Sequence, residues 1–228
     1  MATSWAELST SATANWLPVD HTKYRFYLPS DGEPPFAFSA FSGWDNTASL
    51  VRRVASLAPG LSGLVTKTVV LVGIGLIDVV FYQYIVGPLV RHVLRGTIRA
   101  QLLGFINTAV PDYFPDFVAR IVSADGLQER GILSSNLGSS EGKTAFSSST
   151  KNRVFINRPM DEVSVQNGDY LVFEIGCFGP GSARLMKLQT GYQAQADLPE
   201  DELAVSGNSW VEIDGILQLQ VTAWSSIE

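Results

Sequence analysis

The sequence predicts an all-β protein, an antiparallel β-sandwich or jelly roll of about 8–10 strands. Short apolar or alternating runs recur along the chain, separated by Gly, Pro, Asn, Asp and Ser. Helix signals are confined to one stretch, and no repeat of fixed period indicates a propeller or a solenoid. The runs expected to form strands are residues 23–29, 64–73, 78–86, 94–106, 116–125, 129–136, 152–159, 169–179, 183–191 and 210–224.

Alternation and turn signals support the individual strands. Ile98, Ala100 and Leu102 are separated by polar residues, which is typical of a strand with one buried face. Asp125-Gly126 lies between two runs and predicts a hairpin turn. The most apolar segment, "VVLVGIGLI" at residues 69–77, is too short for a membrane helix. We expect it to form a buried strand pair with a turn or bulge at its glycines, in a soluble protein that does not enter a membrane.

One stretch, residues 45–58, could hold a helix. Asp45 or Asn46 could cap it, and Pro59-Gly60 would end it. Leu50 to Leu57 place apolar residues on one helical face, but the same residues also fit a strand followed by a loop. Both alternatives stay open.

The chain divides into a short extension and one large domain. Residues 1–24 are polar and irregular, and we expect an N-terminal arm that orders only against a partner. They carry no basic segment followed by an apolar one, so no secretory signal is expected. Residues 25–228 would form a single β-sandwich domain. Ser-rich residues 134–150 predict a long polar loop between strands.

The strand expected at residues 169–179 raises the question of an active site, because it carries Glu174 and the only cysteine. Leu171, Phe173 and Ile175 share one face and should be core. Glu174 falls on the opposite face, where it could pair with a basic residue on an adjacent strand. We therefore expect Glu174→Gln to be mild. Cys177 fits a small apolar filler of the core.

Composition and motifs exclude several function classes. A net charge of −6 and a pI near 4.9 give no electrostatic footprint for nucleic acid, and the basic residues of Arg91–Arg99 fit a solvated strand face. A single cysteine and two distant histidines, His21 and His92, offer no metal site. No nucleophile elbow or dinucleotide fingerprint is present. The prediction is that the chain is not an enzyme and has no catalytic, cofactor-binding or metal-binding residues.

Two polar or aromatic features remain as candidates for binding. The acidic run Asp197–Val205 fits a solvated loop or an acidic patch for subunit contacts that faces Arg91–Arg99, and a calcium site is the weaker alternative. Aromatic rings on loops can stack on sugars, although a Trp more often fills the core. The candidate glycan-stacking residues are Trp44, Tyr82, Tyr84 and Trp210.

Five sequence blocks follow one another along the chain: "RFYLPSDGEPPFAFSAFSGWDNTASLVRR", "LRGTIRAQLLG", "ARIVSADGLQERGIL", "NGDYLVFEIG" and "DLPEDELAVSGNSWVEI". In this order they resemble a group of tailed-bacteriophage virion proteins and related prophage sequences. The resemblance spans roughly residues 25 to 213 and departs from the group's pattern at Tyr170, Cys177 and Phe178, where basic or aromatic residues are expected.

The resemblance implies a β-sandwich or jelly-roll module of the phage particle, located on the head or the tail and made in the host cytoplasm. No catalytic residues come with it. The expected function is a capsid decoration (cement) protein or another surface component, acting on the major capsid protein or tail components as a homo-oligomer, with a trimer favoured. The alternative is an adhesion module that recognises host surface polysaccharide.

Overall fold

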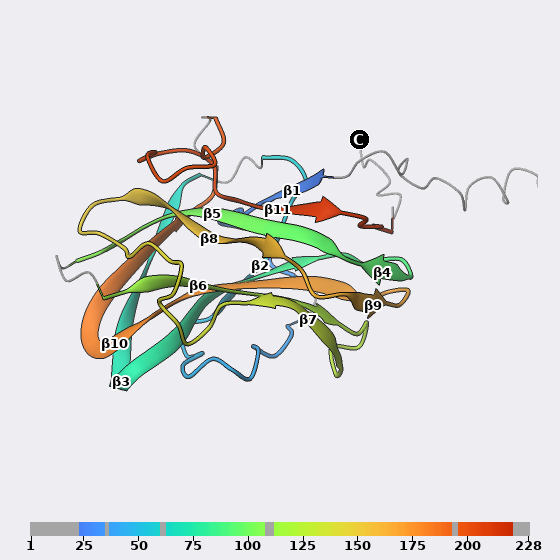
Figure 1. Ribbon diagram of the computed structural model, residues 1–228, viewed down its shortest axis with the longest axis horizontal. Coiled ribbons are helices and arrows are strands. Elements are labelled where there is room, and N and C mark those ends of the chain that lie inside the picture. Colours follow the sequence, from blue (N-terminus) through green and yellow to red (C-terminus); the bar gives the residue numbers. More distant parts are fainter. Residues whose placement is uncertain (1–22, 35–36, 60–62, 108–111, 193–195, 221–228) are drawn as a thin grey trace, which may run out of the picture.

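The computed structural model describes residues 23–34, 37–59, 63–107, 112–192 and 196–220, and these form strands and loops without a helix (Figure 1). None of them forms a helix of the length and apolarity that a membrane crossing needs. The predicted all-β class is confirmed. The strands are β1 (Lys23–Tyr27), β2 (Val51–Val54), β3 (Val65–Val86), β4 (His92–Leu94), β5 (Gly96–Ile106), β6 (Phe114–Val122), β7 (Glu129–Ser135), β8 (Lys151–Pro159), β9 (Val163–Val165), β10 (Tyr170–Thr190) and β11 (Trp210–Gly215).

Nine of these strands form one curled sheet, and β4 and β9 form a small second one. The main path runs β1-β11-β5-β10-β3-β2, with β8 joined to β5, β6 to β10 and β7 to β6. Every described pair of strands is antiparallel except β2 and β3, which run parallel. The expectation of an antiparallel sandwich is therefore corrected to a mixed sheet. Residues 45–58 contribute β2 and loops, so the helical alternative is wrong.

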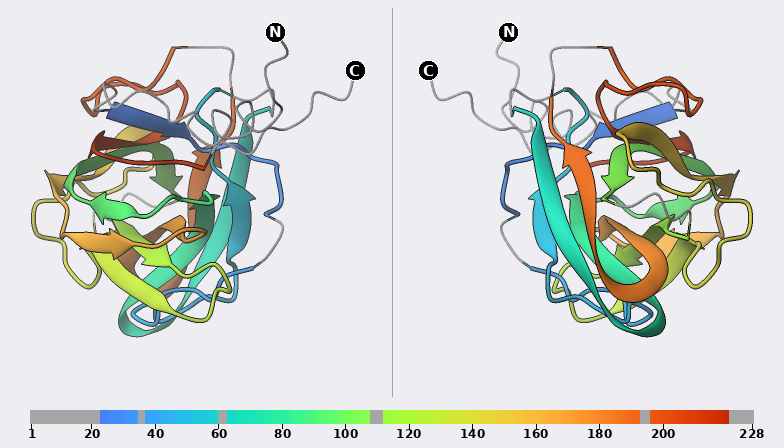
Figure 2. Two further views of the ribbon diagram at one scale, coloured as in Figure 1. Left: turned by 90° about the vertical axis from the view of Figure 1, so that its right-hand side faces the viewer. Right: turned by 90° about the vertical axis from the view of Figure 1, so that its left-hand side faces the viewer.

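The two longest strands, β3 and β10, form a ribbon that bends sharply and joins the two halves of the sheet (Figures 1 and 2). The Lys67 ammonium reaches the Phe81 carbonyl oxygen at 2.7 Å, fourteen residues along the same strand. A straight strand would hold these residues roughly 46 Å apart. Residues 69–77 are thus part of one bent strand, which corrects the expected strand pair.

Two glycines permit this bend. A Cβ atom on Gly181 of β10 would lie 2.5 Å from the Gly73 carbonyl carbon of β3. Such a distance is below any ordinary van der Waals contact, so the two backbones can approach this closely only because Gly181 lacks a side chain. Ala183, just beyond the crossing, has a φ of 55°.

The core lies between the two halves of the curled sheet. Phe26 of β1 and Phe173 of β10 contact across it, with ring centroids 5.8 Å apart, and Phe117 of β6 contacts Phe155 of β8 at 6.2 Å. The predicted core face of Leu171, Phe173 and Ile175 is confirmed, and Cys177 is buried with it.

Several local predictions are also confirmed. Asp125-Gly126 forms the turn between β6 and β7, with Gly126 at a φ of 74°. Residues 136–150 form a loop between β7 and β8, although Phe146 within it is buried. The expected arm, residues 1–24, lies almost wholly outside the described residues. Lys23 and Tyr24, however, belong to β1, so the predicted boundary falls inside a strand.

Candidate assembly surface

The four candidate glycan-stacking residues are buried. Trp44 is 6% exposed and Trp210 is fully buried, and Tyr82 and Tyr84 lie inside the curled sheet with ring centroids 5.7 Å apart. Both indole N–H groups are used internally: Trp44 donates to Glu174 at 2.6 Å and Trp210 to the Leu198 carbonyl at 2.9 Å. A ring must present a face to stack on a sugar, so the prediction for these residues is wrong. Core packing accounts for them.

Glu174 lies at the centre of a buried hydrogen-bond cluster. Its carboxylate accepts hydrogen bonds from the Trp44 indole, the Phe41 backbone N–H, the Gln83 amide at 2.9 Å and the Arg120 guanidinium at 2.8 Å. The partnership with a basic residue on an adjacent strand is as expected, because Arg120 lies on β6. Glu174 is nevertheless fully buried, although the sequence places it on the strand face opposite the core.

The segment 37–50 explains this difference. It packs over the outer face of β3, β10 and β6, where Phe38 contacts Val172, and Trp44 contacts Val80. The sheet is therefore covered on both faces here. Glu174 holds the cover in place through Phe41 and Trp44, so this carboxylate belongs to the framework and not to an exposed active site.

A second cluster of carboxylates lies beside the ribbon, between Asp78 of β3 and Asp116 of β6. Lys143, from the loop between β7 and β8, donates to Asp116 and to the Asn136 carbonyl oxygen. Burial and a hydrogen bond with Asp78 raise the pKa of Asp116 well above its usual value, and Lys143 opposes this shift. Burial likewise raises the pKa of Cys177, so its thiol is unsuited to act as a nucleophile.

The acidic run is held by ion pairs within the chain. Arg25 pairs with Asp197 at 2.9 Å and with Glu212 at 2.8 Å, and Arg99 pairs with Glu200. Within the chain, Arg99 of the Arg91–Arg99 stretch thus faces the acidic run, and its use in subunit contacts stays a prediction. Burial and a hydrogen bond to Asp197 raise the pKa of Tyr27 to about 12.

The described residues hold no group of three potential metal ligands. His92 bonds through Nδ1 to the Val90 carbonyl oxygen at 2.6 Å, and His21 lies outside the described residues. An open groove of about 440 Å³ runs along β2, but its arginines already bond to backbone carbonyls: Arg52 to Phe38, and Arg53 to Ser30.

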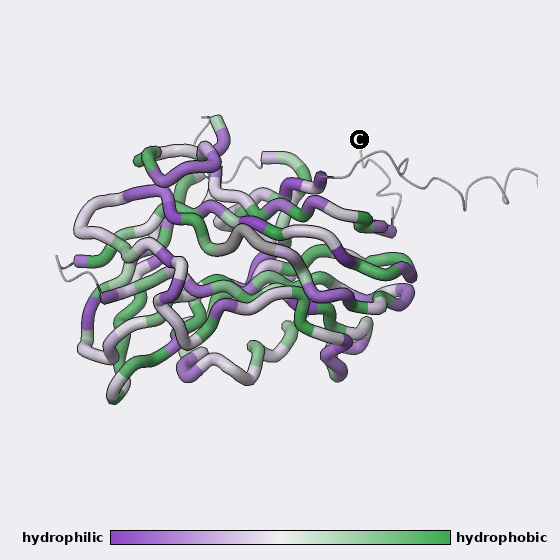
Figure 3. The backbone as a smooth tube through the Cα atoms, in the orientation of Figure 1, coloured by the Kyte–Doolittle hydropathy of each residue, from purple (hydrophilic) through white to green (hydrophobic). Residues whose placement is uncertain are grey.

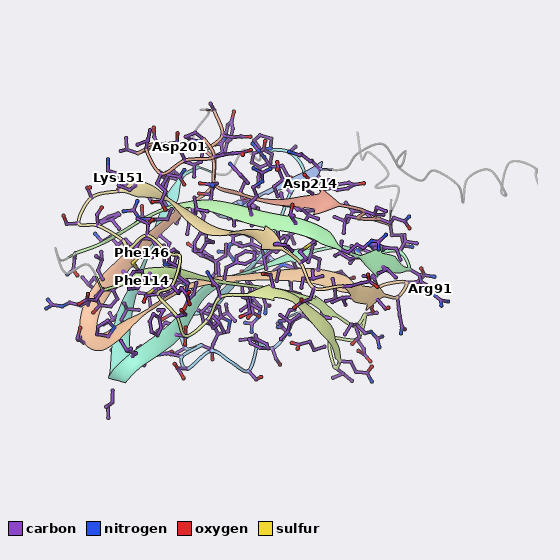
Figure 4. All side chains as sticks on the ribbon, viewed as in Figure 1. Arg91, Phe114, Phe146, Lys151, Asp201 and Asp214 are labelled. Atoms are coloured by element: carbon purple, nitrogen blue, oxygen red, sulfur yellow. The ribbon has the colours of Figure 1, made fainter. Side chains whose placement is uncertain are left out.

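The first half of β3 carries exposed apolar side chains that could bind another chain. Val70, Val72, Ile74 and Leu76 project outward in steps of two, and Ile74 is fully exposed. Figure 3 shows this part of the ribbon as a hydrophobic segment at the periphery of the molecule. Figure 4 draws the described side chains on the ribbon, with Arg91 labelled at the opposite end of the molecule from the β3–β10 bend. A contiguous exposed apolar row of this kind marks an interaction site more often than a solvated face.

The backbone edge of the same half is also open. β10 pairs with one edge of β3, and β2 pairs with the other only from Tyr82 to Ile85. No strand of the described residues pairs with the second edge between Val65 and Leu76. We call this edge, with its four outward apolar side chains, the β3 edge surface. The sequence marked residues 69–77 as the most apolar segment, but because Val69 to Val72 are apolar on both strand faces it could not show which face is left uncovered.

The charged residues of the paired segments 65–76 and 182–190 are all basic: Lys67 on β3, and Arg184 and Lys187 on β10. The Lys67 ammonium faces inward, where it donates to the Phe81 carbonyl oxygen at 2.7 Å and lies 5.0 Å from the Tyr82 ring centroid, so Arg184 and Lys187 supply the charge nearest the β3 edge surface. Burial, followed by the charge of Arg53, lowers the pKa of Lys67 to about 8. The surface thus combines unpaired backbone groups, apolar side chains and positive charge.

No protein-family model matches the chain, and no curated protein matches it. Among solved structures, a CocE/NonD family hydrolase from Staphylococcus aureus is similar at a TM-score of 0.45 and 9% identity, over 87% of this chain and 36% of that one. An alpha-amino acid ester hydrolase is similar at a TM-score of 0.34 and 7% identity, over 84% of this chain and 36% of that one. The structure of infectious bursal disease virus, Gx strain, is similar at a TM-score of 0.16 and 11% identity, over 80% of this chain and 44% of that one.

The chain therefore spans about a third of the length of the two hydrolases. All three TM-scores are too low to establish a shared fold, and no activity is transferred from these proteins to this one.

Proposed function

We propose that this chain is a non-enzymatic structural protein of a tailed-bacteriophage particle. Its role would be that of a capsid decoration (cement) protein, or of a comparable surface component of head or tail. The observation that carries the proposal is the β3 edge surface, because an open apolar strand edge is a template for pairing with another chain. The sequence blocks that resemble phage virion proteins agree with this role.

The protein would stabilise the particle because its binding is linked to the assembled state. A protein that binds only the assembled lattice stabilises it in proportion to its own concentration and affinity. The charged groups of the domain, such as Arg25 and Arg120, are largely paired within the chain, so apolar and backbone contacts at the β3 edge surface would supply the binding. Copies would form a closed homo-oligomer, with a trimer favoured, seated on the major capsid protein or on tail components.

Particles assembled with and without the protein provide the test. Particles that contain it should survive heating and osmotic shock that disrupts those lacking it. Quantitative mass spectrometry of purified particles should find many copies for a head decoration protein and few for a tail component. Equal robustness of the two particle types would overturn the cement role.

Matched variants localise the contact. Val72→Glu places a charge on the β3 edge surface, and Leu127→Glu places the same charge on an exposed leucine of the β6–β7 turn. Adding back wild type or Leu127→Glu should restore robustness, whereas Val72→Glu should not. Restoration by Val72→Glu would show that the surface has no part in assembly.

A further inference from the structure

We propose that the β3 edge surface binds residues 1–22 of a neighbouring copy as an added β-strand. The inference deepens the proposed assembly role and rests on it, because it names the segment that would occupy the surface and link the copies. The mode is β-augmentation, in which main-chain hydrogen bonds supply affinity and alternate side chains supply specificity.

The receiving edge has the length and shape that an added strand needs. Val65–Leu76 presents twelve residues, and β10 holds the opposite edge of this segment in an antiparallel ladder. The right-hand view of Figure 2 shows β3 along the outer margin of the ribbon that it forms with β10. An incoming strand would pair with the open backbone groups and place every second side chain beside Val70, Val72 and Ile74.

The N-terminal segment has the matching periodicity. From Ala6 to Trp16 apolar and polar residues alternate, with Thr10 as the one exception. Positions 6, 8, 10, 12, 14 and 16 are Ala, Leu, Thr, Ala, Ala and Trp, whereas positions 7, 9, 11, 13 and 15 are Glu, Ser, Ser, Thr and Asn. A period of two over eleven residues is typical of a strand with one apolar face, and proline is absent until Pro18. The apolar face would lie against the outward valines.

Charge favours this occupant over a second β3 edge. Residues 1–22 contain Glu7 and Asp20 and neither lysine nor arginine. The receiving ribbon carries Lys67, Arg184 and Lys187 and no acidic residue between 65 and 76 or between 182 and 190. Pairing two β3 edges would bring like charges together, whereas pairing the acidic segment with the basic ribbon brings opposite charges together.

The symmetry of the proposed oligomer also favours the N-terminal segment over a second β3 edge. Two identical edges pair about a twofold axis and stop at a dimer, whereas a segment that enters a different surface on its neighbour is a heterologous contact and can close a ring. The favoured trimer requires the second kind. β1, which follows residue 22, lies at the upper side of the molecule and the β3–β10 bend at the lower side (Figures 1 and 2). Residues 17–22, which would link the added strand to β1, reach at most about 20 Å, so the β3 edge of the neighbouring copy must lie near β1 of the donor.

Disulfide trapping between two differently labelled full-length proteins tests the proposal. One carries Val72→Cys, and the other carries a single cysteine at each position from 6 to 16 in turn. The native Cys177 is fully buried and does not compete. Crosslinks between the two labelled copies should form at Val72→Cys and should rise and fall with a period of two along the segment. Leu127→Cys, equally exposed but remote in the fold, is the control and should form none.

Each other outcome overturns the proposal. Crosslinks within one labelled copy would mean that the chain covers its own edge. Val72→Cys homodimers without segment crosslinks would mean that two β3 edges pair. Crosslinks without the two-residue period would exclude a strand, and the absence of crosslinks would exclude the contact.

Light scattering on the same proteins adds a quantitative arm. Leu8→Glu in the segment and Val72→Glu on the edge should each weaken self-association roughly tenfold or more, because either buries an unpaired charge at an apolar contact. Leu127→Glu should leave the oligomer mass unchanged. If Leu8→Glu or Val72→Glu associates as wild type does, the proposed contact is excluded.

The two proposals fail separately. If particles gain robustness from the protein but segment crosslinks are absent, the assembly role stands and the proposed occupant falls. If crosslinks form as expected in a protein that does not stabilise particles, the strand exchange stands and the particle role falls.

Discussion

The two halves of β3 have nearly the same apolar composition and opposite environments. Every residue from Ile77 to Val86 is buried, including both faces of the strand, whereas every residue from Val70 to Leu76 except Leu71 is exposed. The two halves differ in whether another segment of the chain covers their outer face. The segment 37–50, held by Glu174, lies over the outer face of the second half, and none of the described residues covers the first half in the same way. An apolar strand thus becomes core or interface according to what a distant segment does.

The sharpest test of this comparison is one substitution made in both halves. Val80→Glu places a carboxylate in the buried apolar cluster of Trp44 and Val118, and we expect a loss of at least roughly 4 kcal/mol or a failure to fold. Val72→Glu in the monomer should change the free energy of unfolding by no more than about 0.5 kcal/mol. Urea unfolding at low protein concentration measures both. Similar losses in the two variants would contradict the distinction between the halves.

The second test removes the group that holds the cover. Glu174→Gln leaves Arg120 buried without its closest carboxylate and replaces an acceptor of several N–H groups by an amide. We expect a loss of about 3–5 kcal/mol, which revises the mild effect expected from the sequence. The matched control is Glu162→Gln, whose exposed pair with Arg95 at 3.8 Å should contribute less than about 1 kcal/mol. Equal effects of the two variants would mean that the cluster is not a structural anchor.

The third test concerns the bend that separates the halves. Gly181→Ala forces a Cβ atom against the Gly73 backbone and should cost about 1–3 kcal/mol through overpacking. Gly63→Ala is the control, because an added Cβ there meets nothing within 4 Å. Thermal unfolding of both variants measures the difference. A neutral Gly181→Ala would indicate that the ribbon can bend by another route.

The smallest effect is a pH dependence at the junction of the halves, where Asp78 and Asp116 meet. The folded state raises the pKa of Asp116 above its ordinary value of 3.8, so it holds a proton that the unfolded chain releases. The contribution of this group to stability must therefore decline as pH rises above 3.8. The stability of wild type relative to Asp116→Asn should fall with rising pH, and a difference that is flat or increases would contradict this assignment.

Much of the fold could be predicted from local pattern. The core face of Leu171, Phe173 and Ile175, the Asp125-Gly126 turn and the apolar setting of Cys177 follow from periodicity and turn chemistry. The candidate site could not be predicted in the same way. Residues 69–72 are apolar on both faces of the strand, so the sequence gave no sign that Val70 and Val72 are exposed while Val69 and Leu71 are buried.

The sequence by itself determined that the chain forms strands, where most of them lie and which side chains share a face, because these properties depend on neighbours one or two positions away. Only the tertiary structure decided that residues 65–86 form one bent strand, that Glu174 is buried and that the four aromatic candidates are core. Each of these outcomes depends on segments distant in sequence, such as Trp44 against Glu174 or Gly73 against Gly181. A local pattern records which face is apolar, and the packing of remote segments determines whether that face is covered.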